Sequence, residues 1–196
     1  MTALATTGGG NTPLSPDELA DLIPNLATKE ELNEWERDNI LLAREWAFSD
    51  RTSPLEMLSD QYIRKLHEKM FGETWKWAGL YRLTEKNIGV AVHEVRERLM
   101  VLFGDVRFWI ANKTHAADEI AVRFHHGLVF IHPFPNGNGR HARLIADVLA
   151  KKLGSAPFTW GLANLVKEGF ARTEYLEALR AADQGDVSRL MRFARS

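Results

Sequence analysis

The stretch HPFPNGNGRHAR, from His132 to Arg143, lies between two apolar segments that both have helical periodicity. Pro133 disfavours helix for the residue before it, so the first helix should end near His132. Glycine and asparagine then suit a turn, and apolar residues return at helical spacing after Arg140. The sequence therefore predicts a helix, a polar loop and a second helix.

The loop has the features of an anion-binding site. The first N–H groups of a helix lack internal partners and carry partial positive charge. Gly137, Asn138 and Gly139 fall just before or within the first turn of the second helix, where glycine lets backbone amides approach a ligand closely. Arg140 and Arg143 are three residues apart, so both can direct guanidinium groups at one anion. Two phosphates of a nucleotide fit this arrangement better than one carboxylate does.

His132 stands at the mouth of the loop. An unperturbed imidazole titrates near physiological pH, so it can accept a proton from a hydroxyl group. A general base beside a polyphosphate site points to transfer of a nucleotidyl or phosphoryl group. Alone, a histidine at a helix end or a Gly-Asn turn is more often structural, and the functional interpretation depends on their combination in this order.

Most of the remaining chain has helical patterns. Ser15 and Glu18 form a capping box at the start of a short helix that Pro24 ends. Further helices are expected over residues 28–50, 53–72, 93–114, 117–132, 140–154, 173–183 and 186–196.

The segment between residues 80 and 92 alternates instead of following a helical period. It predicts two short strands, Leu80–Leu83 and Ile88–Val92, around a turn. The expected fold class is therefore all-α, a helical bundle with one short β-hairpin.

Composition limits the functional classes. A chain of 196 residues suits a single domain over residues 15–196, after a small, polar and flexible tail over residues 1–14. A net charge of -1 gives no electrostatic argument for nucleic acid or an anionic membrane as partner. There is no cysteine, no apolar run of membrane-spanning length and no pattern of a secretory signal. A cytoplasmic location is expected.

HPFPNGNGR resembles the signature of the Fic/Doc (Fido) family, H-P-F-x-[DE]-G-N-[GK]-R. WKWAGLYR followed by NIG resembles the segment before and within the family's flap, a β-hairpin that holds the target. YLEALRAADQGD resembles the helix after the motif. The resemblance covers roughly residues 15–195, and the group that it resembles most is named mobile mystery protein B. It implies a Fic-fold helical bundle with the active site at the helix–loop–helix and the flap beside it.

The resemblance also implies an activity. Most active Fic proteins transfer AMP from ATP to a Ser, Thr or Tyr hydroxyl of a target protein and release pyrophosphate. His132 would be the general base, and Phe134 would anchor the loop in the core. The nucleotide would be bound by Gly137, Asn138, Gly139, Arg140 and Arg143, and Gly139 favours AMP transfer because the Doc-type kinase branch has Lys there. The flap residues Lys86, Asn87, Ile88 and Gly89 are candidates for target contact.

Asn136 departs from the family pattern, which has an acidic residue that holds Mg²⁺ at this position. An amide oxygen is neutral and a weaker ligand than the carboxylates that Mg²⁺ uses in proteins. Three interpretations stay open. Asn136 is a weak metal ligand, with Mg²⁺ bound mainly through phosphates and water. The enzyme is a phosphotransferase or uses another nucleotidyl donor. Or the protein is a catalytically weak, toxin-like nucleotide-binding module.

Regulation in many Fic proteins uses a helix with [ST]-x-x-x-E-[GN], whose Glu pairs with the second motif arginine, here Arg143. TSPLEM (Thr52–Met57) and TEYLEA (Thr173–Ala178) match this spacing but not its last position. Both are interpreted as ordinary helix sequence, so a separate antitoxin-like protein is the expected inhibitor. The histidines lack the spacing of a zinc site, and Trp75 and Trp77 are expected in the core.

Overall fold

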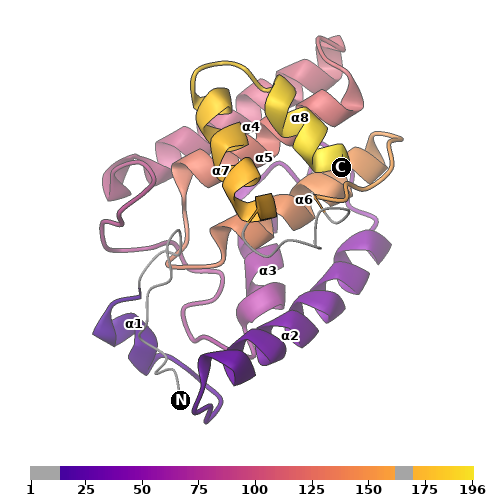
Figure 1. Cartoon of the computed structure of the whole chain (residues 1–196). Helices are drawn as coiled ribbons and strands as arrows, with labels where there is room; N and C mark the ends of the chain where they lie inside the picture. The colour runs from indigo at the N-terminus through magenta and orange to yellow at the C-terminus, as the bar shows by residue number, and fades with distance from the viewer. Residues whose placement is uncertain (1–13, 162–169) are drawn as a thin grey trace.

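The computed structural model describes residues 14–161 and 170–196 (Figure 1). Their regular structure is helical throughout, which confirms the all-α fold class. The helices are α1 (Pro16–Ala20), α2 (Lys29–Ser49), α3 (Asp60–Phe71), the 3-10 turn η1 (Val92–Glu94), α4 (Val95–Asn112), α5 (Ala117–Ile131), α6 (Asn138–Lys152), α7 (Phe170–Asp183) and α8 (Ser188–Arg195). Residues 1–13 of the expected tail lie outside the described part. No helix within that part is both long and apolar enough to cross a membrane.

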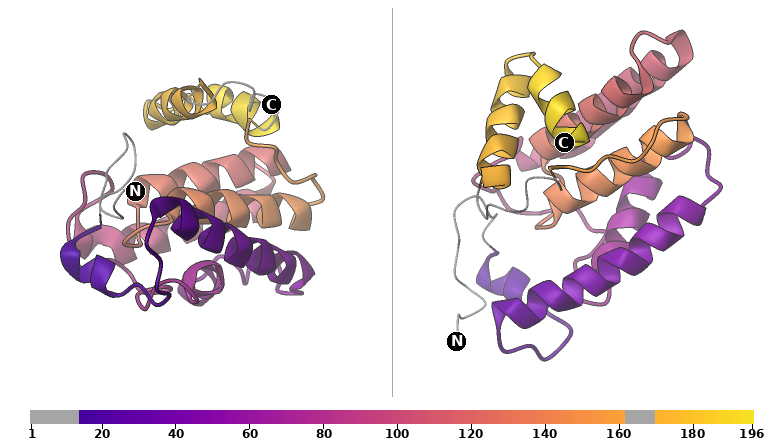
Figure 2. Two further views of the ribbon diagram at one scale, coloured as in Figure 1. Left: turned by 60° about the horizontal axis from the view of Figure 1, so that its bottom comes forward. Right: turned by 45° about the vertical axis from the view of Figure 1, so that its right-hand side comes forward.

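The antiparallel pair α5 and α6 forms the centre of the fold (Figure 2). Helices α2 and α3 pack together on one side of this pair, and α7 and α8 cover the other side. Helix α6 is the most buried element, with Leu144, Ile145, Val148 and Leu149 all inside the core as its periodicity predicts. The loop between α5 and α6 is therefore held at both ends by well-packed helices.

Local capping signals are confirmed at the first two helices. Ser15 and Glu18 form the predicted capping box of α1, and Thr28 with Glu31 forms another at α2. The predicted start of α3 at Ser53 is wrong. Ser53 does cap one turn, through Glu56, but α3 begins at Asp60 with Ser59 as its N-cap.

The two predicted strands, Leu80–Leu83 and Ile88–Val92, are also wrong, because this part of the described chain is extended and irregular. Its backbone N–H groups bond to the neighbouring loop instead of to each other: Arg82 donates to Pro133 O and Val90 to Ile131 O. The side chain of Arg82 also donates a hydrogen bond to the carbonyl of Val90. The groups that a hairpin ladder would need are therefore used elsewhere, and we call residues 80–91 the flap segment.

Three histidines are fully or almost fully buried: His67 and His141 lie against the loop residue Phe134, and His125 packs against Trp160 and Tyr175. His67 accepts from Gly79 N–H at Nδ1 and donates from Nε2 to the carbonyl of Asn136, each at 3.0 Å. His141 donates to the carbonyl of Ile63 at 2.9 Å. Burial lowers the pKa of all three, well below the usual value for His67, to about 3 for His125 and to about 4 for His141. They are neutral at physiological pH.

This burial makes stability sensitive to acid. The unfolded chain binds protons at these histidines near pH 6.5, whereas the folded chain does not until well below pH 5. The free energy of unfolding should therefore be highest above pH 6.5. It should fall between pH 6.5 and 5 by up to about 1.4 kcal/mol per pH unit for each histidine. Urea denaturation at several pH values measures this slope.

The variant His141→Gln tests the cause, because its amide can still donate to Ile63 O but does not titrate. It should have a slope shallower by about one proton. Exposed His93→Gln is the matched control and should keep the wild-type slope. A free energy of unfolding that stays constant from pH 6.5 to 5 would contradict the prediction.

Candidate active site

The loop between α5 and α6 owes its shape to two left-handed residues and one side-chain clamp. His132 ends α5 with φ 55°, and Gly137 precedes α6 with φ 77°. A Cβ on Gly137 would lie 2.6 Å from the ring of Phe71, so this position also needs glycine for space. The amide of Asn138 bonds both the N–H and the carbonyl of Phe134, each at 2.9 Å.

Phe134 is fully buried and stacks on His67 with ring centroids 3.8 Å apart, as expected of a loop anchor. Because Asn138 holds the loop closed with its side chain, only its backbone N–H remains for a ligand at the start of α6. Gly139 faces open space, with nothing within 4 Å of where a Cβ would lie. The N-terminus of α6 is thus held by Phe134 and Asn138 on the side of the core, and it is open at Gly139.

His132 is 5% exposed, and burial lowers the pKa of its imidazole to about 4. A hydrogen bond to the backbone of Val129 opposes this shift, while the positive charges of Arg82 and Lys86 add to it. The imidazole is therefore neutral at physiological pH and able to accept a proton.

Arg82 connects the flap segment to the loop and was not among the candidates from the sequence. Its guanidinium is buried and donates to the carbonyls of His132 (2.7 Å), Thr84 (3.1 Å) and Val90. Gly89 also touches the loop, since a Cβ there would lie 2.6 Å from the Cβ of His132. The signal for Arg82 was present at the end of WKWAGLYR.

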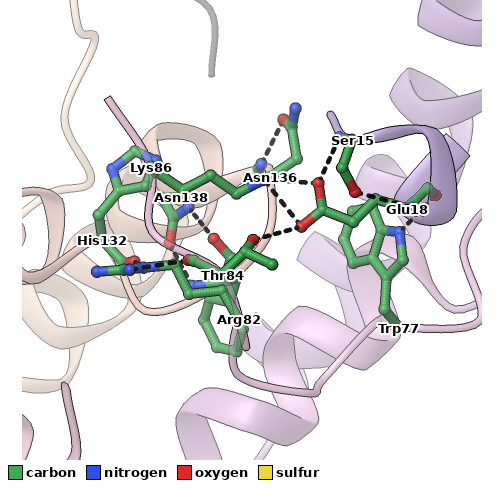
Figure 3. Close-up of polar contacts among 11 residues, drawn as sticks. Ser15, Glu18, Trp77, Arg82, Thr84, Lys86, His132, Asn136 and Asn138 are labelled. Atoms are coloured by element: carbon green, nitrogen blue, oxygen red, sulfur yellow. Dashed lines mark hydrogen bonds and ion pairs between the residues drawn. The ribbon is translucent and has the colours of Figure 1, made fainter. Parts of the chain in front are cut away.

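The flap residues fall into two groups. Asn87 and Ile88 are exposed, which suits contact with a target. The side chain of Lys86 is only 4% exposed and turns inward, where its ammonium pairs with Glu18 at 2.6 Å. Figure 3 shows Lys86 extending past His132, with its ammonium between the Glu18 carboxylate and the side chain of Asn136. The expectation that Lys86 sits at an exposed turn is not met.

The two motif arginines reach towards different helices. Arg140 pairs with Glu36 of α2 at 2.5 Å and lies 4.9 Å from the ring centroid of Phe71. Arg143 lies over the ring of Tyr175 in α7, at 5.6 Å. Glu36, which sequence reasoning missed, is 5% exposed and also accepts from Trp75 Nε1 at 2.7 Å. The guanidinium groups therefore stand on two sides of the start of α6.

The glutamates of the two segments weighed as inhibitory bond to other groups, although Tyr175 of TEYLEA does contact Arg143. In TSPLEM, Glu56 accepts from the N–H of Ser53, and in TEYLEA, Glu177 pairs with Arg189 of α8. Their interpretation as ordinary structural sequence agrees with these contacts, although Thr52–Met57 is a turn and not a helix. Among the other candidates, His126 bonds Asp183 at 2.8 Å.

The two tryptophans of WKWAGLYR lie in the core, as expected from the sequence. Trp75 and Trp77 are buried and stacked on each other, with ring centroids 5.0 Å apart. The carboxylate of Asp186 accepts from the N–H of Ser188, at the start of α8. None of these residues contributes to the loop.

Comparison with known proteins finds a family match over the segment that contains the loop. A profile of the Fic/DOC family matches residues 57–150. The protein adenylyltransferase Fic of Nematostella vectensis is 29% identical over 143 residues, which cover 70% of this chain and 32% of the relative. The protein adenylyltransferase fic-1 of Caenorhabditis elegans is 29% identical over 135 residues, covering 67% and 25%. The chain thus spans about a third or less of the length of these relatives.

Solved structures share the fold. Fic-1 (residues 134–508) from C. elegans superposes with a TM-score of 0.64 and 26% identity, over 90% of this chain and 51% of that one. BepC of Bartonella tribocorum, solved with bound AMPPNP, has a TM-score of 0.68 at 17% identity, over 91% and 96% of the two chains. The segment that contains the loop thus matches the Fic/DOC family profile, and a solved Fic structure shares the fold of this chain.

Proposed function

We propose that this protein is a protein adenylyltransferase that transfers AMP from ATP to a Ser, Thr or Tyr hydroxyl of a target protein. The observation that carries the proposal is the loop itself, where a neutral buried base, His132, stands beside the open N-terminus of α6. The names of the relatives and the AMPPNP bound to BepC support ATP as the co-substrate.

In the proposed mechanism the target hydroxyl loses its proton to His132 as its oxygen attacks the α-phosphorus of ATP. The bond from the α-phosphorus to the bridging oxygen breaks, and pyrophosphate leaves with the bonding electron pair. The backbone N–H groups of Gly137, Asn138 and Gly139 would donate to phosphate oxygens, with the positive end of α6 behind them. Arg140 and Arg143 would add charge-assisted hydrogen bonds.

The flap segment would hold the target. Asn87 and Ile88 are exposed, and Gly89 lies against His132, so a strand of target placed along the flap would bring a hydroxyl close to the imidazole. The cytoplasmic location, an antitoxin-like partner, the absence of nucleic-acid and membrane partners and the mobile mystery protein B subgroup stay predictions from the sequence.

Labelled ATP tests the reaction class. Wild-type protein incubated with a host lysate should transfer label from α-labelled ATP and none from γ-labelled ATP. His132→Ala should lose transfer while its affinity for ATP, measured by calorimetry, changes little, because the imidazole acts on the hydroxyl and not on the phosphates. His115→Ala, at the partly exposed junction before α5, is the control.

Other outcomes identify the alternatives. Label from γ-labelled ATP would indicate a phosphotransferase instead. Binding of ATP without any transfer would indicate the weak nucleotide-binding module.

The pH profile tests the state of the base. An unperturbed histidine would lose roughly nine tenths of its neutral form between pH 7.5 and 5.5. Because burial lowers the pKa of His132 to about 4, kcat/KM should stay nearly constant over this range. Initial rates of label transfer between pH 5.5 and 7.5 check this. A tenfold decline towards pH 5.5, with the protein still folded by circular dichroism, would contradict the lowered pKa of His132.

Glu36 should tune the affinity for ATP, because its carboxylate neutralises Arg140 in the nucleotide-free protein. Glu36→Gln keeps an oxygen for Trp75 Nε1 but removes the negative charge, so ATP should bind several-fold more tightly. Glu34→Gln, exposed on the same helix, is the matched control. Weaker binding in Glu36→Gln would mean that the ion pair serves to orient Arg140 for the phosphates. Calorimetry with ATP separates these results.

A further inference from the structure

The residues around Asn136 fit a divalent cation poorly. Mg²⁺ in proteins is held by one or two carboxylates together with substrate phosphates. Asn136 has a neutral amide, and its Oδ1 already accepts the N–H of Gly137 at 2.6 Å. Within residues 14–161 and 170–196, no group of three His, Asp or Glu side chains is arranged to hold a metal ion.

The acid nearest to Asn136 in Figure 3, Glu18, is already committed to other groups. Its carboxylate accepts from Lys86 and from the N–H of Ser15 at 2.7 Å. Burial tends to raise the pKa of Glu18, but these bonds outweigh it and the pKa is lowered. Glu18 is therefore an ionised partner of Lys86 rather than a vacant ligand.

Lys86 brings a positive charge to this place. Its side chain is 4% exposed, and its ammonium points between Glu18 and the side chain of Asn136. It is close enough to His132 to act on that imidazole electrostatically. A buried ammonium needs a charged partner, and Glu18 supplies it, so Lys86 is held inside the protein instead of at an exposed turn.

The charges of the two arrangements match. A carboxylate with a bound divalent cation has one net positive charge, and an amide with an ammonium has the same charge before that of Glu18 is counted. We propose that Lys86 takes the place of the divalent cation, so that its ammonium binds the phosphates of the nucleotide beside Asn136. The inference rests on the proposed adenylyltransferase function and assigns this chain a phosphate site that needs no Mg²⁺.

Glu18 fits this role as the holder of Lys86. An ammonium has three N–H donors, so it can bond the carboxylate and phosphate oxygens at the same time. In the nucleotide-free protein Glu18 compensates the buried charge, at distances of 2.6 and 2.8 Å. When pyrophosphate leaves, the ammonium would neutralise the charge that develops on it, together with the motif arginines. Removing the Glu18 charge should thus tighten ATP binding.

Calorimetry with ATP in EDTA and with ATP in excess Mg²⁺ tests the inference on the full chain. Wild type should bind with dissociation constants that differ by less than about threefold between the two conditions. In EDTA, Lys86→Met should weaken binding about tenfold or more, the effect of one lost charge-assisted hydrogen bond. Lys86→Arg should restore most of the affinity. Lys69→Met, an exposed lysine on α3, is the matched control and should bind as wild type.

Two double variants keep the test decisive. Lys86→Met alone leaves the Glu18 carboxylate without its cation. Combining it with Glu18→Gln removes both charges, so no buried charge is left unpaired. This double variant should show the same loss of affinity for ATP as Lys86→Met. Asn136→Asp with Lys86→Met recreates a carboxylate without the ammonium. Its ATP binding should become dependent on Mg²⁺ by about tenfold. Glu18→Gln alone should bind ATP more tightly than wild type.

The outcomes separate this inference from the proposed function. Wild-type ATP binding that improves tenfold or more with Mg²⁺, or that is unchanged in both Lys86→Met variants, would overturn the role of Lys86 and leave the proposed function standing. If wild type binds no ATP under either condition, the proposed function and this inference both fail. Label transfer from α-labelled ATP in EDTA would support both.

Discussion

The guanidinium of Arg82 lies buried between two parts of the chain and donates to backbone carbonyls of both, His132 on one side and Thr84 and Val90 on the other. Burying a guanidinium is unfavourable unless its N–H groups have hydrogen-bond partners. Arg82 therefore stabilises the one arrangement in which the flap segment and the loop both supply carbonyls to it. The base, the flap and the start of α6 keep their relative positions for this reason. A lysine at position 82 would have a single ammonium in place of the planar guanidinium, so it could not donate to the carbonyls of both parts of the chain in the same geometry.

Sequence reasoning succeeded where the signal acts within one or two helical turns. The capping box of Ser15, the stop before Pro133 and the restart of the helix, predicted at Arg140 and found at Asn138, all depend on neighbours along the chain. The same holds for the apolar stripe of α6. These local signals were enough to predict the all-α class and the helix–loop–helix that forms the candidate site.

Prediction from the sequence failed where a residue distant in the chain determines the local structure. The alternation in residues 80–92 indicated strands, but Arg82 takes the carbonyl that a hairpin would use. Glu36 and Arg140 are 104 residues apart, and Glu18 and Lys86 are 68 apart, so neither pair leaves a mark in local periodicity. The inward turn of Lys86 in particular cannot be read from a flap motif, because it depends on where α1 packs.

The pairing of an amide at position 136 with an inward lysine at position 86 also constrains how such a sequence can change. An aspartate at 136 would add a second carboxylate beside an ammonium that Glu18 already neutralises, and loss of the lysine would leave the Glu18 carboxylate beside the amide; in the proposed arrangement each site would repel phosphate. Either single replacement should therefore weaken phosphate binding. The double replacement should restore the charge balance once a divalent cation is bound. If Lys86 has the proposed role, positions 86 and 136 are expected to change together.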